Sequence, residues 1–196
     1  MTVTERSSTA ARFLIVPGLG NSGPEHWQTV WEARLPACTR VAQRDWDRPE
    51  RELWLQAFRQ AVEAAGAPVV AVAHSLGCAL VAHAAARWPS LVARSVSAAL
   101  LVAPADVDSP AHTPPETRGF APIPLARLPF PAAVVASRTD PYMASARARV
   151  LAAAWGADFV DAGAVGHINA ASALGDWPAG RRVLDALLDR AHLARW

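Results

Sequence analysis

The stretch Val69-Val70-Ala71-Val72-Ala73-His74-Ser75-Leu76-Gly77-Cys78-Ala79-Leu80 sets how the rest of the chain is interpreted. A short apolar run ends at His74-Ser75, and a run with helical character follows without a linker. Such a pattern indicates a buried strand that turns directly into a helix, with Ser75 at the corner. Small residues flank the serine, because Ala73 lies two positions before it and Gly77 two positions after it. The pattern Ala-His-Ser-Leu-Gly therefore differs by one methyl group from the G-x-S-x-G nucleophile elbow.

A serine at the start of a helix has two interpretations. In an elbow, the hydroxyl stands above the carboxyl edge of the sheet, at the amino end of the next helix. There the helix dipole and free backbone N–H groups stabilise a developing oxyanion. In the alternative, Ser75 is an ordinary helix N-cap, since serine is a preferred capping residue. The order of acid and histidine residues further along the chain decides between the two.

Composition favours one globular domain and excludes several function classes. The chain has 196 residues, of which 52% are hydrophobic and 18% charged, which suits a single domain over residues 12–196 after a flexible N-terminus, residues 1–11. The net charge of +2 and the scattered arginines give no case for nucleic acid. Two cysteines make no disulfide framework, and no spacing indicates a metal or another cofactor. No apolar run suits a signal peptide or a membrane span, so a cytoplasmic protein is expected.

Apolar strand-like runs alternate with amphipathic helix-like runs along the whole chain. The predicted strands are residues 12–16, 39–44, 69–74, 96–102, 131–137 and 158–161. The predicted helices are residues 24–35, 50–65, 76–88, 144–155 and 179–193, with Pro89 closing the third. The proline-rich segment 108–128 is predicted as a surface loop that could border the active site. This alternation predicts an α/β fold with a mostly parallel sheet and helices on both faces.

A serine nucleophile needs a base within hydrogen-bond reach and an acid that orients the base. His167 is the preferred base, because it follows the last strand in a loop of small residues. Asp140 is the preferred acid, since it comes directly after the fifth strand, and Asp106 is the alternative one strand earlier. For Asp140 the competing role is an Asx-turn before Pro141. The remaining histidines after Ser75 are expected to be structural or surface residues: His83, His112 and His192.

Two loops should supply the oxyanion hole and the substrate pocket. One donor is the N–H of Leu76, the residue after the nucleophile, and the other comes from Leu19 or Gly18 in the loop after the first strand. Trp46 is a candidate pocket wall, and the alternative is that it packs under its own loop. His26 could also face the cleft, with a surface position as the alternative.

With these residues assigned, the chain resembles the retinoblastoma-binding protein 9/YdeN family of small serine hydrolases. The matching stretches are Val16-Pro17-Gly18-Leu19-Gly20-Asn21-Ser22, His26-Trp27, Asp45-Trp46-Asp47-Arg48-Pro49, Ala73-His74-Ser75-Leu76-Gly77, Ser137-Arg138-Thr139-Asp140-Pro141, Gly166-His167-Ile168-Asn169 and Gly175-Asp176-Trp177-Pro178. The resemblance implies a compact α/β-hydrolase fold without a lid domain, about six parallel strands in the order 2-1-3-4-5-6, and a triad of Ser75, Asp140 and His167. Asn169 joins the pocket candidates on this basis. The partner-binding motif Leu-x-Cys-x-Glu is absent, so no protein partner is carried over.

Three functions are compared. The first is a serine hydrolase, a carboxylesterase acting on small or medium acyl esters without a cofactor. The second is a non-enzymatic interaction module on a hydrolase fold, motivated by eight tryptophans and by Ala73 in place of glycine. The third is a nucleotide binder that uses the glycine-rich loop 18–23, which lacks the spacing and the lysine of a P-loop. Three triad members in the expected order favour the first.

Overall fold

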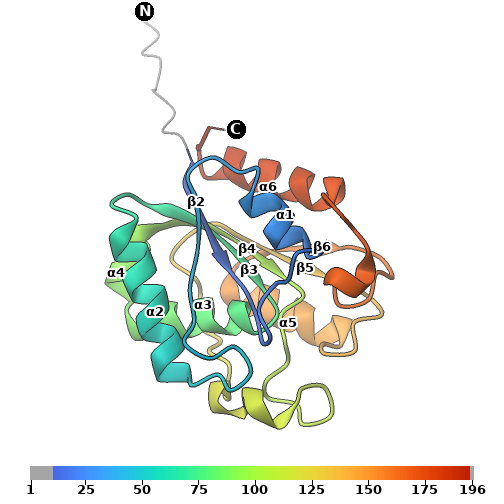
Figure 1. The fold of residues 1–196 in the computed structure, drawn as a ribbon. Helices are drawn as coiled ribbons and strands as arrows, with labels where there is room; N and C mark the ends of the chain where they lie inside the picture. Colours follow the sequence, from blue (N-terminus) through green and yellow to red (C-terminus); the bar gives the residue numbers. More distant parts are fainter. Residues whose placement is uncertain (1–10, 195–196) are drawn as a thin grey trace, which may run out of the picture.

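The computed structural model describes residues 11–194, and its centre is a six-stranded sheet in which every neighbouring pair is parallel (Figure 1). The strand order is β2-β1-β3-β4-β5-β6, so the predicted order and fold class are confirmed. The strands are β1 Phe13–Val16, β2 Cys38–Arg40, β3 Val69–His74, β4 Val96–Val102, β5 Ala132–Ala136 and β6 Asp158–Asp161. The helices are α1 Trp27–Glu32, α2 Arg51–Ala64, α3 Leu76–Arg87, α4 Pro89–Ser95, α5 Ser145–Trp155 and α6 Pro178–Arg190.

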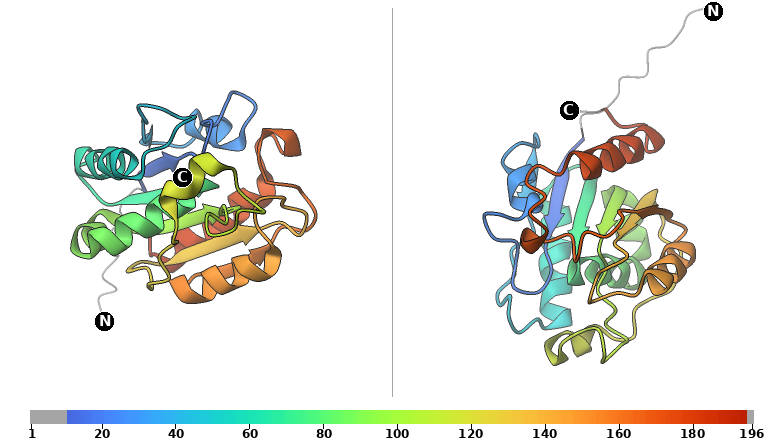
Figure 2. Two further views of the ribbon diagram at one scale, coloured as in Figure 1. Left: turned by 90° about the horizontal axis from the view of Figure 1, so that it is seen from below. Right: turned by 90° about the vertical axis from the view of Figure 1, so that its right-hand side faces the viewer.

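Helices cover both faces of the sheet (Figure 2), and a hydrophobic core layer lies between the sheet and the helices on each face. Successive side chains of a strand point alternately into one layer and the other. In β3, Val70 and Val72 pack in the layer that holds α1 and α6. Ala71 and Ala73 point the other way and pack in the layer that holds α2, α3, α4 and α5. Because successive side chains of a strand face opposite sides, a strand buried on both faces is a continuous apolar run rather than an alternating pattern.

The first helix and the second strand are shorter than predicted. The helix begins at Trp27 rather than Pro24, because His26 has extended backbone angles and its imidazole caps the helix. The strand ends at Arg40 rather than Arg44. Directly after the strand, Val41 still donates its N–H to the carbonyl of Ile15, and no residue from 42 to 44 pairs with β1.

The third helix ends at Arg87, just before Pro89, as predicted, but Pro89 also begins a further helix, α4, that was not predicted. Proline has no N–H to continue the preceding helix, yet its fixed φ suits the first helical position. The proline-rich segment also contains a short 3-10 helix, Pro115–Phe120. Most of the predicted flexible N-terminus lies outside the described residues, and its last residue, Ala11, is buried.

Among residues 11–194, no single helix has both the length and the apolar character needed to cross a membrane. The pair α3 and α4 passes the same test only when taken together, and the two helices meet at an angle of 117°.

Candidate active site

Ser75 occupies a strained corner between β3 and α3. Its φ and ψ are 54° and −122°, a positive-φ conformation that residues with a side chain rarely adopt. The backbone is held there by a hydrogen bond from the N–H of Ser75 to the carbonyl of Val102, at 3.0 Å. Such strain persists only where the surrounding structure imposes it, and it is common at functional sites. Ser75 therefore lies in a strained turn that joins a buried strand directly to a helix.

Two glycines permit the close packing that this corner requires. A methyl group on Gly77 would lie 2.2 Å from the carbonyl oxygen of Val16, so α3 could not approach β1 with any side chain at that position. A methyl group on Gly18 would lie 2.8 Å from Cβ of Ser75. Ala73, which replaces the usual first glycine, is fully buried in the sheet and has room for its methyl group.

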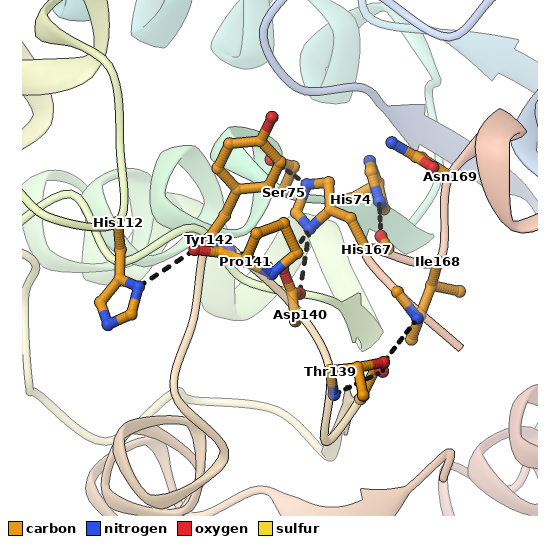
Figure 3. Close-up of polar contacts among 12 residues, drawn as sticks. His74, Ser75, His112, Thr139, Asp140, Pro141, Tyr142, His167, Ile168 and Asn169 are labelled. Atoms are coloured by element: carbon orange, nitrogen blue, oxygen red, sulfur yellow. Dashed lines mark hydrogen bonds and ion pairs between the residues drawn. The ribbon is translucent and has the colours of Figure 1, made fainter. Parts of the chain in front are cut away.

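Ser75, His167 and Asp140 form one line of hydrogen bonds across three loops (Figure 3). The imidazole Nε2 of His167 lies 2.9 Å from Oγ of Ser75, and its Nδ1 lies 2.9 Å from each carboxylate oxygen of Asp140. A carboxylate can only accept, so Nδ1 carries the proton and the bare Nε2 accepts from the serine hydroxyl. The side chains of His167 and Asp140 are 8% and 1% exposed, so the array is shielded from water.

Neighbouring groups fix the acid in place. The carboxylate of Asp140 accepts from the backbone N–H of Tyr142 at 2.9 Å, which is the expected Asx-turn, and it contacts His167 at the same time. The ring of Tyr142 lies edge-on to the imidazole, with 4.6 Å between centroids. The alternative acid, Asp106, lies beside the guanidinium of Arg147 at 3.6 Å and makes no contact with His167 among the described residues.

The amino end of α3 faces the loop after β1, where the oxyanion donors were expected. The N–H of Leu76 finds no acceptor in the described part of the chain, as is normal in the first turn of a helix. Gly18 lies directly beside it, since a methyl group there would be 3.1 Å from that nitrogen. Leu19 lines the adjoining cavity, whereas the N–H of Gly20 is already bound to the carbonyl of Trp46. Both expected sources of the second donor, Gly18 and Leu19, therefore lie beside Ser75 or its cavity.

A cavity of about 180 Å³ opens over Ser75. Its lining includes two of the three predicted pocket residues, His26 and Asn169, but not Trp46. Trp46 instead packs edge-on against Trp54, with 5.6 Å between ring centroids. The full lining is Leu19, Asn21, His26, His74, Ser75, Ala105, Thr113, Pro114, Thr117, Tyr142, His167 and Asn169. The proline-rich loop therefore borders the cavity, through Thr113, Pro114 and Thr117.

His26 is 4% exposed, so the alternative of a surface position is wrong. Its Nδ1 accepts from the backbone N–H of Gln28 at 3.1 Å. Burial is the main cause that lowers the pKa of His26 to about 4, and the nearby guanidinium of Arg40 adds to it. The ring is therefore neutral at pH 7, with its proton on Nε2, which has no hydrogen-bond partner within residues 11–194.

His74 makes a contact in the candidate site that was not predicted from the sequence. Its Nε2 lies 2.9 Å from the carbonyl oxygen of His167, so this nitrogen carries the proton and donates. Burial lowers the pKa of His74 well below its ordinary value, and the ring is neutral. Two other histidines contact carbonyl groups elsewhere: His83 that of Phe120, and His112 that of Pro141.

A parallel sheet of this order, with a serine in a strained strand–helix corner and a histidine and an aspartate on later loops of the same edge, defines an α/β hydrolase. The chain belongs to the serine hydrolase family, whose model matches residues 13–186.

Solved structures agree with this assignment. A putative YdeN-like hydrolase from Pectobacterium atrosepticum is 31% identical over 93% of this chain and 92% of that chain, with a TM-score of 0.81. The ydeN product of B. subtilis is 18% identical over 92% of this chain and 100% of that chain, with a TM-score of 0.72. Est1E from Butyrivibrio proteoclasticus is 13% identical over 93% and 90%, with a TM-score of 0.69. The resemblance to YdeN-like hydrolases is confirmed. No curated protein matches the chain.

Proposed function

We propose that the protein hydrolyses small, uncharged carboxylic esters through an acyl-enzyme on Ser75. The observation that carries this proposal is the continuous line from Ser75 Oγ through His167 to Asp140, with both of its links at 2.9 Å. A hydroxyl, a base and an orienting acid at these distances are the parts that nucleophilic acyl transfer needs.

The proposed reaction has two halves. The Oγ of Ser75 attacks the ester carbonyl carbon while Nε2 of His167 takes the hydroxyl proton, and the imidazolium then gives that proton to the departing alcohol. Water next gives a proton to the same Nε2 and attacks the acyl-enzyme, and collapse of the second intermediate returns a proton to Oγ and releases the acid. Asp140 keeps the imidazole in the reactive tautomer and stabilises its positive charge.

The negative charge that develops on the substrate carbonyl oxygen needs hydrogen-bond donors that form an oxyanion hole. The N–H groups of Leu76 and Leu19 are proposed for this role, because the first is free at the amino end of α3 and the second belongs to a residue that lines the cavity. In comparable sites one such donor lowers the barrier by about 3 kcal/mol.

The size and chemistry of the cavity support the proposed substrate class. Its volume, about 180 Å³, is below the roughly 300–1,000 Å³ of pockets for drug-sized ligands, which favours a short acyl group. None of its lining residues is an arginine, aspartate or glutamate, and burial keeps His26 and His74 neutral. A charged acyl group would find no counter-ion among these residues, and desolvating it would be costly.

The tryptophans give little support to an interaction module. Trp27, Trp31, Trp54, Trp155 and Trp177 are buried in the described structure, so they build the core rather than an exposed face. The glycine-rich loop 18–23, considered above as a nucleotide site, packs through Gly18 against Ser75. This contact supports a role of the loop beside the serine rather than in nucleotide binding.

The test is hydrolysis of p-nitrophenyl esters with acyl chains from two to eight carbons. Ser75→Ala and His167→Ala should each lower kcat at least 10³-fold, while His192→Asn, at an exposed histidine outside the cavity, should leave kcat unchanged. Short chains should be preferred. Turnover that survives Ser75→Ala would refute the proposal.

A further inference from the structure

The loop that carries His167 is held by two ring N–H donors from distant parts of the chain. Nε2–H of His74, at the end of β3, donates to the carbonyl of His167 at 2.9 Å (Figure 3). Nε1–H of Trp27, the first residue of α1, donates to the carbonyl of Ile168 at 2.7 Å. Two successive carbonyl groups of the loop are thus bound from the sheet and from a helix.

This loop needs restraint because its backbone is strained. Ile168, directly after His167, has a φ of 51°, whereas the φ of 63° at Gly166, directly before it, costs little because glycine has no side chain. A positive φ is unfavourable for any residue with a side chain and especially for a β-branched one. Released from its partners, Ile168 would relax toward negative φ and turn the adjoining peptide that carries the imidazole.

The side chains of both donors, Trp27 and His74, are buried and held in place by their surroundings. Trp27 is fully buried, and its indole packs against the rings of Trp31 and Trp177, with centroids 4.8 and 4.9 Å away. His74 is buried and neutral, so its single proton remains on the nitrogen that faces the carbonyl of His167. Ile168 is also fully buried, which leaves water no easy access to replace a lost donor.

We infer that Trp27 and His74 are positioning residues: by binding the carbonyls of Ile168 and His167, they aim the imidazole of His167 at Oγ of Ser75. Neither residue needs to touch the reacting atoms for this role. The inference rests on the proposed function, because it is the use of His167 as a base that makes its aim matter. Displacements of about 1 Å in such a group can cost about 10²-fold in rate.

The fold supplies a matched control for Trp27. Trp31, in the same helix and the same aromatic stack, is also fully buried, and its Nε1–H donates to the carbonyl of Asp176 at 2.8 Å. Trp27→Phe and Trp31→Phe therefore remove the same group from the same layer, but only the first frees the loop of His167. We expect Trp27→Phe to lower kcat 10- to 100-fold with KM within 2-fold of the wild type, and Trp31→Phe to change kcat less than 3-fold at a similar loss of Tm.

Two further measurements keep the test decisive. If Trp27→Phe does not fold, His74→Gln and His74→Leu replace it, because glutamine can still donate an N–H and should retain at least 10-fold more activity than leucine. The low-field proton resonance of Nδ1–H of His167, which does not depend on turnover, should shift or broaden in Trp27→Phe and not in Trp31→Phe.

Equal kcat values in the two tryptophan variants, together with an unchanged His167 resonance in both, would overturn the inference. If the wild type hydrolyses no ester and Ser75 takes up no acyl-type probe, the proposed function fails on its own. The resonance of His167 would then still decide whether Trp27 positions the imidazole.

Discussion

His26 should make the folded state sensitive to acid, and its environment permits a clean test. The imidazole is buried, neutral and fixed as the N-cap of α1 through its acceptor Nδ1. Asparagine is a preferred N-cap whose side-chain oxygen can accept the same bond from Gln28, but it does not titrate. His26→Asn should therefore keep the cap and remove the proton-binding group.

The magnitude follows from the pKa of His26, which burial lowers from 6.5 in the unfolded chain to about 4 in the folded protein. The folded state then binds fewer protons than the unfolded state, so stability is unaffected above pH 6.5 and falls as the pH drops from 6.5 toward 4. At about 1.36 kcal/mol for each pKa unit, the full loss is on the order of 3 kcal/mol, of which about 2 kcal/mol is reached at pH 5.

The assay is urea unfolding of the wild type and His26→Asn at pH 8, 7, 6 and 5. Both proteins should lose stability in acid, because the pKa of His74 is also lowered by burial and His74 is present in both. Between pH 8 and pH 5 the wild type should lose about 2 kcal/mol more than the variant. Equal losses in the two proteins would refute the reasoning that His26 is buried in its neutral form.

Three further predictions concern the corner and the array. Gly77→Ala should destabilise the protein by about 3 kcal/mol in urea unfolding, because the new methyl group would meet the carbonyl of Val16. The control is Gly119→Ala, which has open space around it and should change stability by no more than about 0.5 kcal/mol. Ser75→Gly should be more stable than Ser75→Ala by about 1 kcal/mol, since glycine relieves the strain of φ 54°; equal stability would show that the corner is unstrained. Asp140→Asn should lower kcat for p-nitrophenyl acetate about 10⁴-fold with a similar KM, and a loss smaller than 10-fold would argue against its proposed role.

The strands of the sheet could be predicted from the sequence because their signals were local, whereas the strand order followed from the resemblance to the YdeN family. The buried strands are mostly apolar runs, such as Val96–Val102, which the structure reproduces at both ends. The end of the edge strand β2 and the N-cap of α1 were harder to predict. The second strand lies at the edge of the sheet, so few contacts fix its end, and a histidine cap at His26 is too uncommon to expect from its residue type.

The candidate site was predictable where chain order carries information. In this fold the nucleophile, acid and base follow one another along the chain, and this order singled out Ser75, Asp140 and His167. Side-chain direction was not predictable. Trp46 packs against Trp54 instead of lining the cavity, and the contact of His74 with the carbonyl of His167 was not predicted. Both outcomes depend on packing between segments far apart in the sequence.

The most direct test of the central claim is covalent labelling of Ser75 by a fluorophosphonate, followed by peptide mass spectrometry of the wild type and of His167→Ala. An imidazole that activates the corner hydroxyl should give one label per chain, on the peptide that contains Ser75, at a rate at least 10³-fold above that of His167→Ala. A label on another residue, or equal labelling rates in the two proteins, would contradict it.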